Sequence, residues 1–219
     1  MLVTGGAGGL GRAVTATLLE SGWRVVVPTE TEGELDSRAG LETCVADLTD
    51  PDDVARAVRR AAGAKEWPLR ALVNLVGGFA ADQPVAETPL DTFERQFALN
   101  LRPTYLVTQA ALPRLLSAGG GSIVCTSSNA ALQPFAGAAG YAASKAAVLA
   151  FAKVVAQEHA AEGVRCNAIV PTIIDTPANR AAMPESEHHK LVPPERIARV
   201  VRFLVSDDSA AVNGQGVVV

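Results

Sequence analysis

Short apolar runs alternate with longer helical segments along the chain. The apolar and β-branched runs have the length of buried strands and are predicted at residues 25–27, 43–46, 69–76, 122–126, 165–170 and 215–219. Helices are predicted at residues 12–21, 51–63, 89–117, 142–161 and 194–206. This β-α rhythm predicts an α/β fold, with one doubly wound parallel sheet flanked by helices.

No internal repeat, linker or second domain interrupts this pattern, so residues 1–219 are predicted to form a single domain. The least regular stretch, residues 176–194, holds four prolines and is the expected substrate loop, a mobile lid. Only three residues precede Thr4, so the first strand is expected to be brief or trimmed.

Composition and charge exclude several classes of function. The net charge is −4 and no stretch is densely basic, so we expect no nucleic-acid partner. No apolar run approaches the roughly 18–20 residues of a membrane span, and no secretory signal is visible. We therefore expect a cytoplasmic protein with no membrane partner. Three scattered cysteines and the adjacent His188 and His189 lack ligand spacing, so no metal site is expected.

The segment Tyr141-Ala-Ala-Ser-Lys145 lies on a predicted helix, thirteen residues after Ser128. Residues four apart on a helix lie on one face, about 5–6 Å from each other. A nearby ammonium lowers the pKa of a phenol, which suits Tyr141 and Lys145 to acid/base work. An exposed pair on a surface helix is the alternative.

A glycine-rich turn, Thr4-Gly-Gly-Ala-Gly-Gly-Leu-Gly11, stands between the first apolar residues and a helix. Backbone N–H groups at such a turn bind a pyrophosphate, as in Rossmann-type folds. Gly6, Gly8 and Gly11 fit one known spacing, and Gly5, Gly9 and Gly11 fit another, so the count leaves the register open.

Together these motifs resemble the short-chain dehydrogenase/reductase family over residues 2–219. The resemblance implies an NAD(P)-dependent oxidoreductase, which transfers a hydride between nicotinamide and the carbonyl or hydroxyl of a small-molecule substrate. Tyr141 would be the general acid/base, Lys145 would bind the ribose and Ser128, rather than Ser127, would bind the substrate oxygen. Asn100 would position a water for proton relay.

The same resemblance implies cofactor contacts from the ends of several strands. Asp47 would contact the adenine, and Thr176 would hold the carboxamide. The full implied set is Gly5, Gly8, Gly9, Leu10, Gly11, Thr29, Asp47, Leu48, Asn74, Val76, Gly77, Tyr141, Lys145, Pro171, Ile174 and Thr176. Other interpretations stay open: Asp47 as a helix cap, Asn100 at a local kink, Ser128 in a strand-end turn, and Thr176 as a turn cap.

The sequence departs from the family's usual pattern at Asn74-Leu-Val-Gly-Gly78, where one sheet-bracing amide is lost, and at Pro171-Thr172. It also ends at Val219 without a tail that supports one subunit contact. The family association predicts a homodimer or homotetramer through the helices near residues 92–117 and 142–161.

The end of the second strand indicates which nicotinamide is bound. Thr29 occupies the deciding position, followed by Glu30 and Glu32, while Arg24 is too early in the strand to help. A 2′-phosphate would meet like charge there, so NAD(H) is preferred over NADP(H).

Two alternative functions remain. Residues 74–79 and 175–185 resemble the dihydropteridine reductase branch, which implies an NADH-dependent reductase, although that branch usually lacks a serine such as Ser128. A non-catalytic nucleotide sensor is the third possibility. Phe79, Phe135 and Met183 are expected either to line a modest, partly apolar pocket or to pack in the core or lid.

Overall fold

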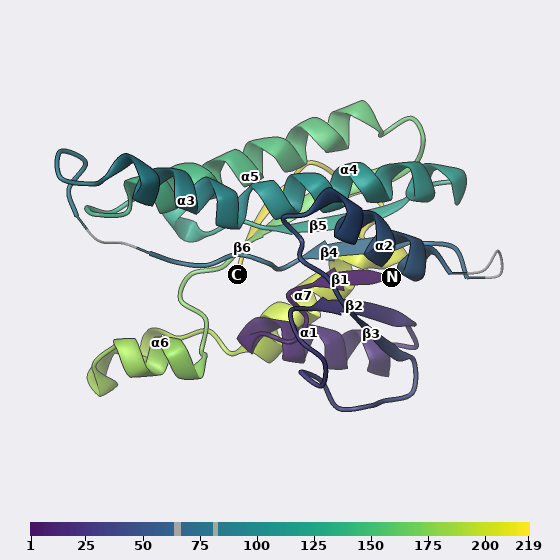
Figure 1. Ribbon diagram of the computed structural model, residues 1–219, viewed down its shortest axis with the longest axis horizontal. Helices are drawn as coiled ribbons and strands as arrows, with labels where there is room; N and C mark the ends of the chain where they lie inside the picture. The colour runs from purple at the N-terminus through teal and green to yellow at the C-terminus, as the bar shows by residue number, and fades with distance from the viewer. Residues whose placement is uncertain (64–66, 81–82) are drawn as a thin grey trace.

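Seven parallel strands form one sheet in the order β3-β2-β1-β4-β5-β6-β7 in a computed structural model that describes residues 1–63, 67–80 and 83–219 (Figure 1). The strands are β1 (Leu2–Thr4), β2 (Val25–Thr29), β3 (Leu41–Val45), β4 (Ala71–Asn74), β5 (Gly121–Thr126), β6 (Val164–Val170) and β7 (Gly216–Val218). The order reverses between β1 and β4, and ligands of such sheets bind at this switch point, beyond the carboxyl ends of the strands.

Helices cover both faces of the sheet. They are α1 (Gly9–Glu20), α2 (Pro51–Ala62), α3 (Leu90–Asn100), α4 (Arg102–Ser117), α5 (Ala139–Glu158), α6 (Pro177–Ala182) and α7 (Pro194–Val205). Three short 3₁₀ helices are η1 (Asn129–Ala131), η2 (Glu185–Lys190) and η3 (Asp207–Ser209). In Figure 1, α1 and α7 lie below the sheet, whereas α2 to α5 lie above it.

Successive strand residues contribute to opposite cores, as the two-residue period of a strand requires. Leu2 and Val26 pack in the core beneath α2, α4 and α5, while Val3 and Val27 pack in the core beneath α1 and α7. All four side chains are fully buried, which explains why the strands read as continuous apolar runs.

The single helix predicted at residues 89–117 is wrong, because α3 ends at Asn100 and α4 begins at Arg102. Pro103 has no N–H to donate to a carbonyl one turn earlier, and the Thr104 hydroxyl donates to the Asn100 carbonyl instead, at 3.0 Å. Asn100 is therefore the last residue of α3, and its contacts are described below.

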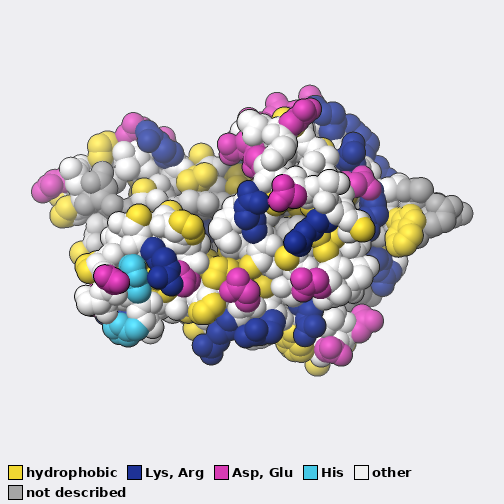
Figure 2. Space-filling model, turned by 90° about the horizontal axis from the view of Figure 1, so that it is seen from below, with side chains coloured by type: hydrophobic (Ala, Val, Ile, Leu, Met, Phe, Trp, Pro, Cys, Tyr) yellow, Lys and Arg dark blue, Asp and Glu magenta, His cyan; other side chains and the backbone are white. Residues whose placement is uncertain are grey.

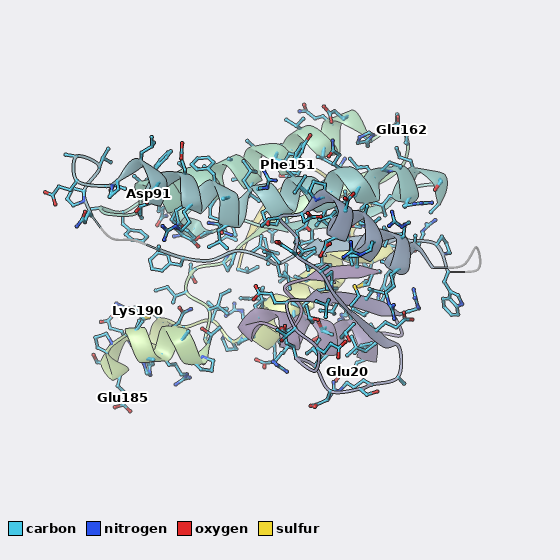
Figure 3. The ribbon with its side chains drawn as sticks, viewed as in Figure 1. Glu20, Asp91, Phe151, Glu162, Glu185 and Lys190 are labelled. Atoms are coloured by element: carbon cyan, nitrogen blue, oxygen red, sulfur yellow. The ribbon has the colours of Figure 1, made fainter. Side chains whose placement is uncertain are left out.

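The expected irregular loop at residues 176–194 is also largely helical, since it contains α6 and η2. Thr176 caps α6 by accepting a hydrogen bond from the Asn179 N–H, and Pro177 follows at the first helical position. This segment lies apart from the sheet in Figure 1, and Figure 3 shows Lys190 on its upper side and Glu185 on its lower side. Residues 176–194 are called the lid below.

By length and composition, α5 is apolar enough to cross a membrane, which the sequence analysis did not anticipate. In this fold α5 packs on α3 and β6, and its buried apolar residues Val148, Ala152, Val155 and Ala156 belong to the core. On the face seen in Figure 2, acidic and basic side chains are interspersed.

Candidate active site

Some positions of the glycine turn between β1 and α1 have no room for a side chain. A Cβ on Gly11 would lie 2.0 Å from the Gly5 carbonyl oxygen, and one on Gly5 would lie 3.0 Å from the Val76 nitrogen. Gly5 also has a positive φ of 65°, which disfavours other residues. A Cβ on Gly8 would meet its nearest neighbour only at 3.4 Å. The steric requirement therefore favours the spacing of Gly5, Gly9 and Gly11, with Gly6 packed against β2.

This turn fits the phosphates of a dinucleotide. It ends at the N-terminus of α1, where backbone N–H groups have no partner within the helix and favour negative charge. The bare backbone at Gly5, Gly8 and Gly9 lines the cavity described next, so a phosphate can approach the chain closely.

A cavity of about 1640 Å³ extends from the glycine turn to Tyr141, along the carboxyl edge of the sheet. Most residues that the sequence predicts for the site line it: Gly5, Gly8, Gly9, Leu10, Gly11, Thr29, Asp47, Leu48, Val76, Gly77, Ser128, Tyr141, Lys145, Pro171, Ile174 and Thr176. Asn74 and Asn100 do not.

Asn74 braces the sheet at the switch point. Its fully buried side chain donates to the Thr108 hydroxyl at 3.0 Å and accepts from the Thr4 hydroxyl at 3.5 Å. Its backbone carbonyl accepts from Thr126 at 2.8 Å. The side chain therefore connects β1 to α4. Asn74 was predicted to contact the cofactor, but it does not line the cavity.

Tyr141 and Lys145 lie on one face of α5, as their spacing predicts, with the Lys145 Nζ 6.0 Å from the centre of the Tyr141 ring. Lys145 is 4 % exposed and donates to the Thr126 carbonyl oxygen at 3.1 Å. Burial lowers the pKa of Lys145 to about 8. A buried ammonium loses its hydration, which disfavours the charged form.

The predicted lowering of the Tyr141 pKa is wrong for this structure. Burial raises the pKa of Tyr141, and interaction with the Ser128 side chain opposes that rise. The sequence supplied the spacing of the ammonium but not the desolvation of the phenol, which dominates here.

The two serines at the end of β5 differ in their contacts. The Ser127 hydroxyl donates to the Lys145 carbonyl oxygen at 2.8 Å and so holds α5 to the sheet. The Ser128 oxygen accepts from the Ala130 N–H at 3.2 Å, which leaves its O–H available as a donor beside Tyr141. Ser128 also caps η1, which is the strand-end turn role, and it lines the cavity as well.

Asn100 lies behind the cavity wall, fully buried. Its Oδ1 accepts from the Gly78 N–H at 3.0 Å, and its Nδ2 donates to the Ser144 hydroxyl at 3.2 Å. A Cβ on Gly77 would lie 2.6 Å from the Asn100 Oδ1 and 2.9 Å from the Lys145 Nζ. Gly77 therefore lets both side chains approach the loop after β4.

The far end of the cavity is acidic. Glu30, Glu34, Asp47 and Asp53 line it from the segments after β2 and β3. The sequence pointed to Glu30 and Glu32 but not to Glu34. The Glu34 carboxylate accepts a hydrogen bond from the Thr31 N–H at 2.6 Å, and this contact folds the loop back. Asp47 accepts from Thr49, which lowers the pKa of Asp47, whereas Asp50 caps α2, so Asp47 does not cap that helix.

The lid joins the glycine turn directly. A Cβ on Gly9 would lie 2.7 Å from the Thr176 Cγ2, so the first residue of the lid rests on the first residue of α1. Thr176 both caps α6 and lines the cavity. The Asp175 carboxylate forms an ion pair with Arg180 at 2.5 Å, and His188 approaches the carbonyl oxygens of Arg180 and Met183.

A family model described as short chain dehydrogenase matches residues 1–187. The chain is 33% identical to 2-(R)-hydroxypropyl-CoM dehydrogenase of Xanthobacter autotrophicus, over 99% of this chain and 95% of that protein. It is 34% identical to carbonyl reductase [NADPH] 2 of Sus scrofa, over 100% and 93%. A short-chain type dehydrogenase/reductase from Mycobacterium ulcerans superposes with a TM-score of 0.91 at 29% identity, covering 100% of this chain and 86% of that one. The chain therefore belongs to the short-chain dehydrogenase/reductase family of NAD(P)-dependent oxidoreductases.

Proposed function

We propose that this protein interconverts a carbonyl and a hydroxyl group on a small-molecule substrate, with Tyr141 as the general acid/base. One observation carries the proposal. The side chains of Ser128, Tyr141 and Lys145 line the same cavity as the glycine turn. A substrate oxygen at Tyr141 and a dinucleotide on the turn would thus share one cavity.

The bound nicotinamide dinucleotide supplies or accepts the hydride, which protein side chains cannot do. Gly5, Gly8 and Gly9 would hold its phosphates, and Lys145 its ribose. A phenol is protonated at neutral pH, and burial raises the pKa of Tyr141 further, so Tyr141 is in the form that donates a proton to a carbonyl oxygen. The free O–H of Ser128 would donate to the same oxygen. Asn100 has one N–H and one lone pair left, which suits it to the proposed water relay.

Substitution of the phenol tests this role. Tyr141→Phe removes the proton donor and is expected to lower kcat by roughly 10²–10⁴-fold while NADH or NADPH binding, measured by calorimetry, stays within about twofold. Tyr105 is the chain's other tyrosine, exposed on α4 outside the cavity, so Tyr105→Phe is the matched control. Retention of most of the kcat in Tyr141→Phe would show that the phenol is not the proton donor.

We also propose that NAD(H) is preferred over NADP(H). Among the residues described, the basic side chains that line the cavity are Lys145 and Lys190, neither of which follows β2 or β3. The end formed after β2 and β3 carries four carboxylates instead. A 2′-phosphate there would gain no ion pair and would meet repulsion, whereas a ribose hydroxyl can donate to a carboxylate.

The double substitution Thr29→Arg with Glu30→Ala tests the assignment of the 2′ site. It adds a cation and removes an anion, which should improve NADPH affinity by about tenfold, or about 1.4 kcal/mol. Titration of both proteins with NADH and NADPH measures the change. An unchanged ratio of the two affinities would place the 2′ site elsewhere.

The other inferences from the sequence remain proposals. A dimer or tetramer would form through the helices near residues 92–117 and 142–161, which are α3, α4 and α5. Tyr105 on α4 and Val154 on α5 are about half exposed, and the Tyr105 and Phe151 rings lie 5.9 Å apart (Figure 3 labels Phe151). A sensor without catalysis would bind cofactor but turn over no carbonyl. The Ser128 hydroxyl beside Tyr141 favours a carbonyl over a dihydropterin, so the dihydropteridine-type reductase is the weaker alternative.

A further inference from the structure

Apolar side chains remain open to solvent inside the cavity, close to the proposed proton donor. Phe79 is 62 % exposed and Phe135 is 51 % exposed, and both line the cavity. Leu99 and Ile173 are also exposed there. These four residues come from the loop after β4, from α3, from the segment after η1 and from the segment after β6. Of these four, Phe79 and Phe135 lie against each other and are called the aromatic wall below.

The Phe79 ring adjoins the Tyr141 phenol, and the Phe135 ring adjoins the Phe79 ring. The Phe79 ring meets the Tyr141 ring edge to face, with centroids 5.0 Å apart, and the Phe135 ring lies 6.3 Å from the Phe79 ring. Folded proteins bury most of a phenylalanine side chain, because exposed apolar area is unfavourable in water. Each ring here leaves on the order of 100 Å² for an apolar partner to cover. A group bonded to the carbon that reacts at Tyr141 is in position to cover it.

Charge at this end of the cavity argues against an anionic substrate. The acidic lining residues belong to the segments after β2 and β3, at the other end. Lys190 lines the cavity from the lid but is paired with Glu187, and Arg180 is paired with Asp175. Within the part of the chain that the structure describes, the wall near Tyr141 thus offers no unpaired cation besides Lys145, which the ribose would occupy.

We propose that the substrate is an uncharged ketone or secondary alcohol with a ring-sized apolar group on the reacting carbon, which packs on Phe79 and Phe135. This inference rests on the proposed function and adds the substrate class. Tyr141 contributes the proton, and the aromatic wall orients the carbon that bears the carbonyl. An anionic substituent on the ring would face apolar side chains and lose hydration without gaining an ion pair.

The test compares acetophenone with acetone, which differ in one phenyl group, and with 4-acetylbenzoate, which adds a carboxylate. Reduction is followed with NADH and NADPH in the wild type, in Phe79→Ala and in Phe135→Ala. Phe203→Ala is the matched control, since Phe203 is an exposed phenylalanine on α7 that does not line the cavity. Phe79→Leu keeps an apolar side chain and serves if Phe79→Ala folds poorly.

In the wild type, kcat/KM for acetophenone should exceed that for acetone by at least roughly 30-fold, and 4-acetylbenzoate should be at least about tenfold poorer than acetophenone. Phe79→Ala and Phe135→Ala should each reduce the acetophenone-to-acetone ratio by about tenfold, Phe79→Leu by less, and Phe203→Ala not at all. Because both substrates are measured with the same preparation, this ratio does not depend on the fraction of active enzyme.

Three results would overturn the substrate class while leaving the proposed reaction in place. They are an equal kcat/KM for acetophenone and acetone, an acetophenone-to-acetone ratio that Phe79→Ala and Phe135→Ala leave unchanged, and a preference for 4-acetylbenzoate. Cofactor binding without turnover of any of the three ketones would overturn both the reaction and the substrate class. These outcomes are distinct, because the first set requires measurable reduction and the second excludes it.

Discussion

Gly11→Ala tests whether the backbone contacts of the glycine turn are as close as the structure shows. The new Cβ would lie 2.0 Å from the Gly5 oxygen and 2.7 Å from two backbone atoms of Gly6. Side-chain rotation cannot relieve these contacts, so α1 must move away from β1. We expect overpacking to cost about 3 kcal/mol, at the upper end of the usual range. Higher helix propensity of alanine returns about 1 kcal/mol, leaving a net loss of about 2 kcal/mol.

For a chain of 219 residues, that loss lowers Tm by about 4–8 °C. Gly8→Ala is the matched control in the same turn, because its Cβ would meet the Gly5 oxygen at an ordinary 3.4 Å. Replacing a helix-capping glycine with alanine there should cost only about 0.5–1 kcal/mol. Calorimetric melting of the three proteins measures the difference, and NADH titration should show at least a roughly tenfold weaker affinity in Gly11→Ala, because the phosphate-facing N–H groups move. Equal Tm values for the two variants would refute the close packing at Gly11.

Two further predictions concern Lys145 and the proposed subunit contact. The unfolded chain keeps the Lys145 proton up to about pH 10.5, whereas the folded chain releases it near 8, so the unfolded state binds more protons in this window and stability rises with pH. Relative to Lys145→Met, the wild-type free energy of unfolding should increase by roughly 2 kcal/mol from about pH 7.5 to about 9.5 in denaturant titrations, and a constant difference would contradict the pKa assignment. Val154→Glu should shift the protein to monomer in light scattering. The same substitution at Val85, which is 75 % exposed and lies outside α4 and α5, should not, and an unchanged oligomeric state in Val154→Glu would remove α5 from the contact.

Features set by local periodicity could be predicted from the sequence. The apolar runs gave the strands to within a few residues, and the helical spacing placed Tyr141 and Lys145 on one face of α5. The glycine turn was predicted as a phosphate site, but its register was not. The two spacings share Gly11, and they are distinguished by the positive φ of Gly5 and by the lack of any neighbour closer than 3.4 Å to a Cβ on Gly8, which only the structure shows.

Features that depend on burial or on distant contacts could not be predicted. The spacing of Lys145 suggested a lowered Tyr141 pKa, yet desolvation by the fold raises it. Asn100 has the same residue type and position that the family implies, but its partners, Gly78 and Ser144, come from other elements. Glu34 enters the cavity because its loop folds back through Thr31, a contact that no periodicity indicates.

The contact between Gly9 and Thr176 joins the proposed phosphate site to the lid. Thr176 rests where a Gly9 side chain would stand, and its hydroxyl fixes the first turn of α6. The same residue therefore adjoins the proposed phosphate site and starts the lid whose Met183 lines the cavity. Because a Cβ on Gly9 would lie 2.7 Å from the Thr176 Cγ2, a side chain at position 9 would displace the first residue of the lid. Glycine at position 9 thus serves the placement of the lid as much as the approach of a phosphate.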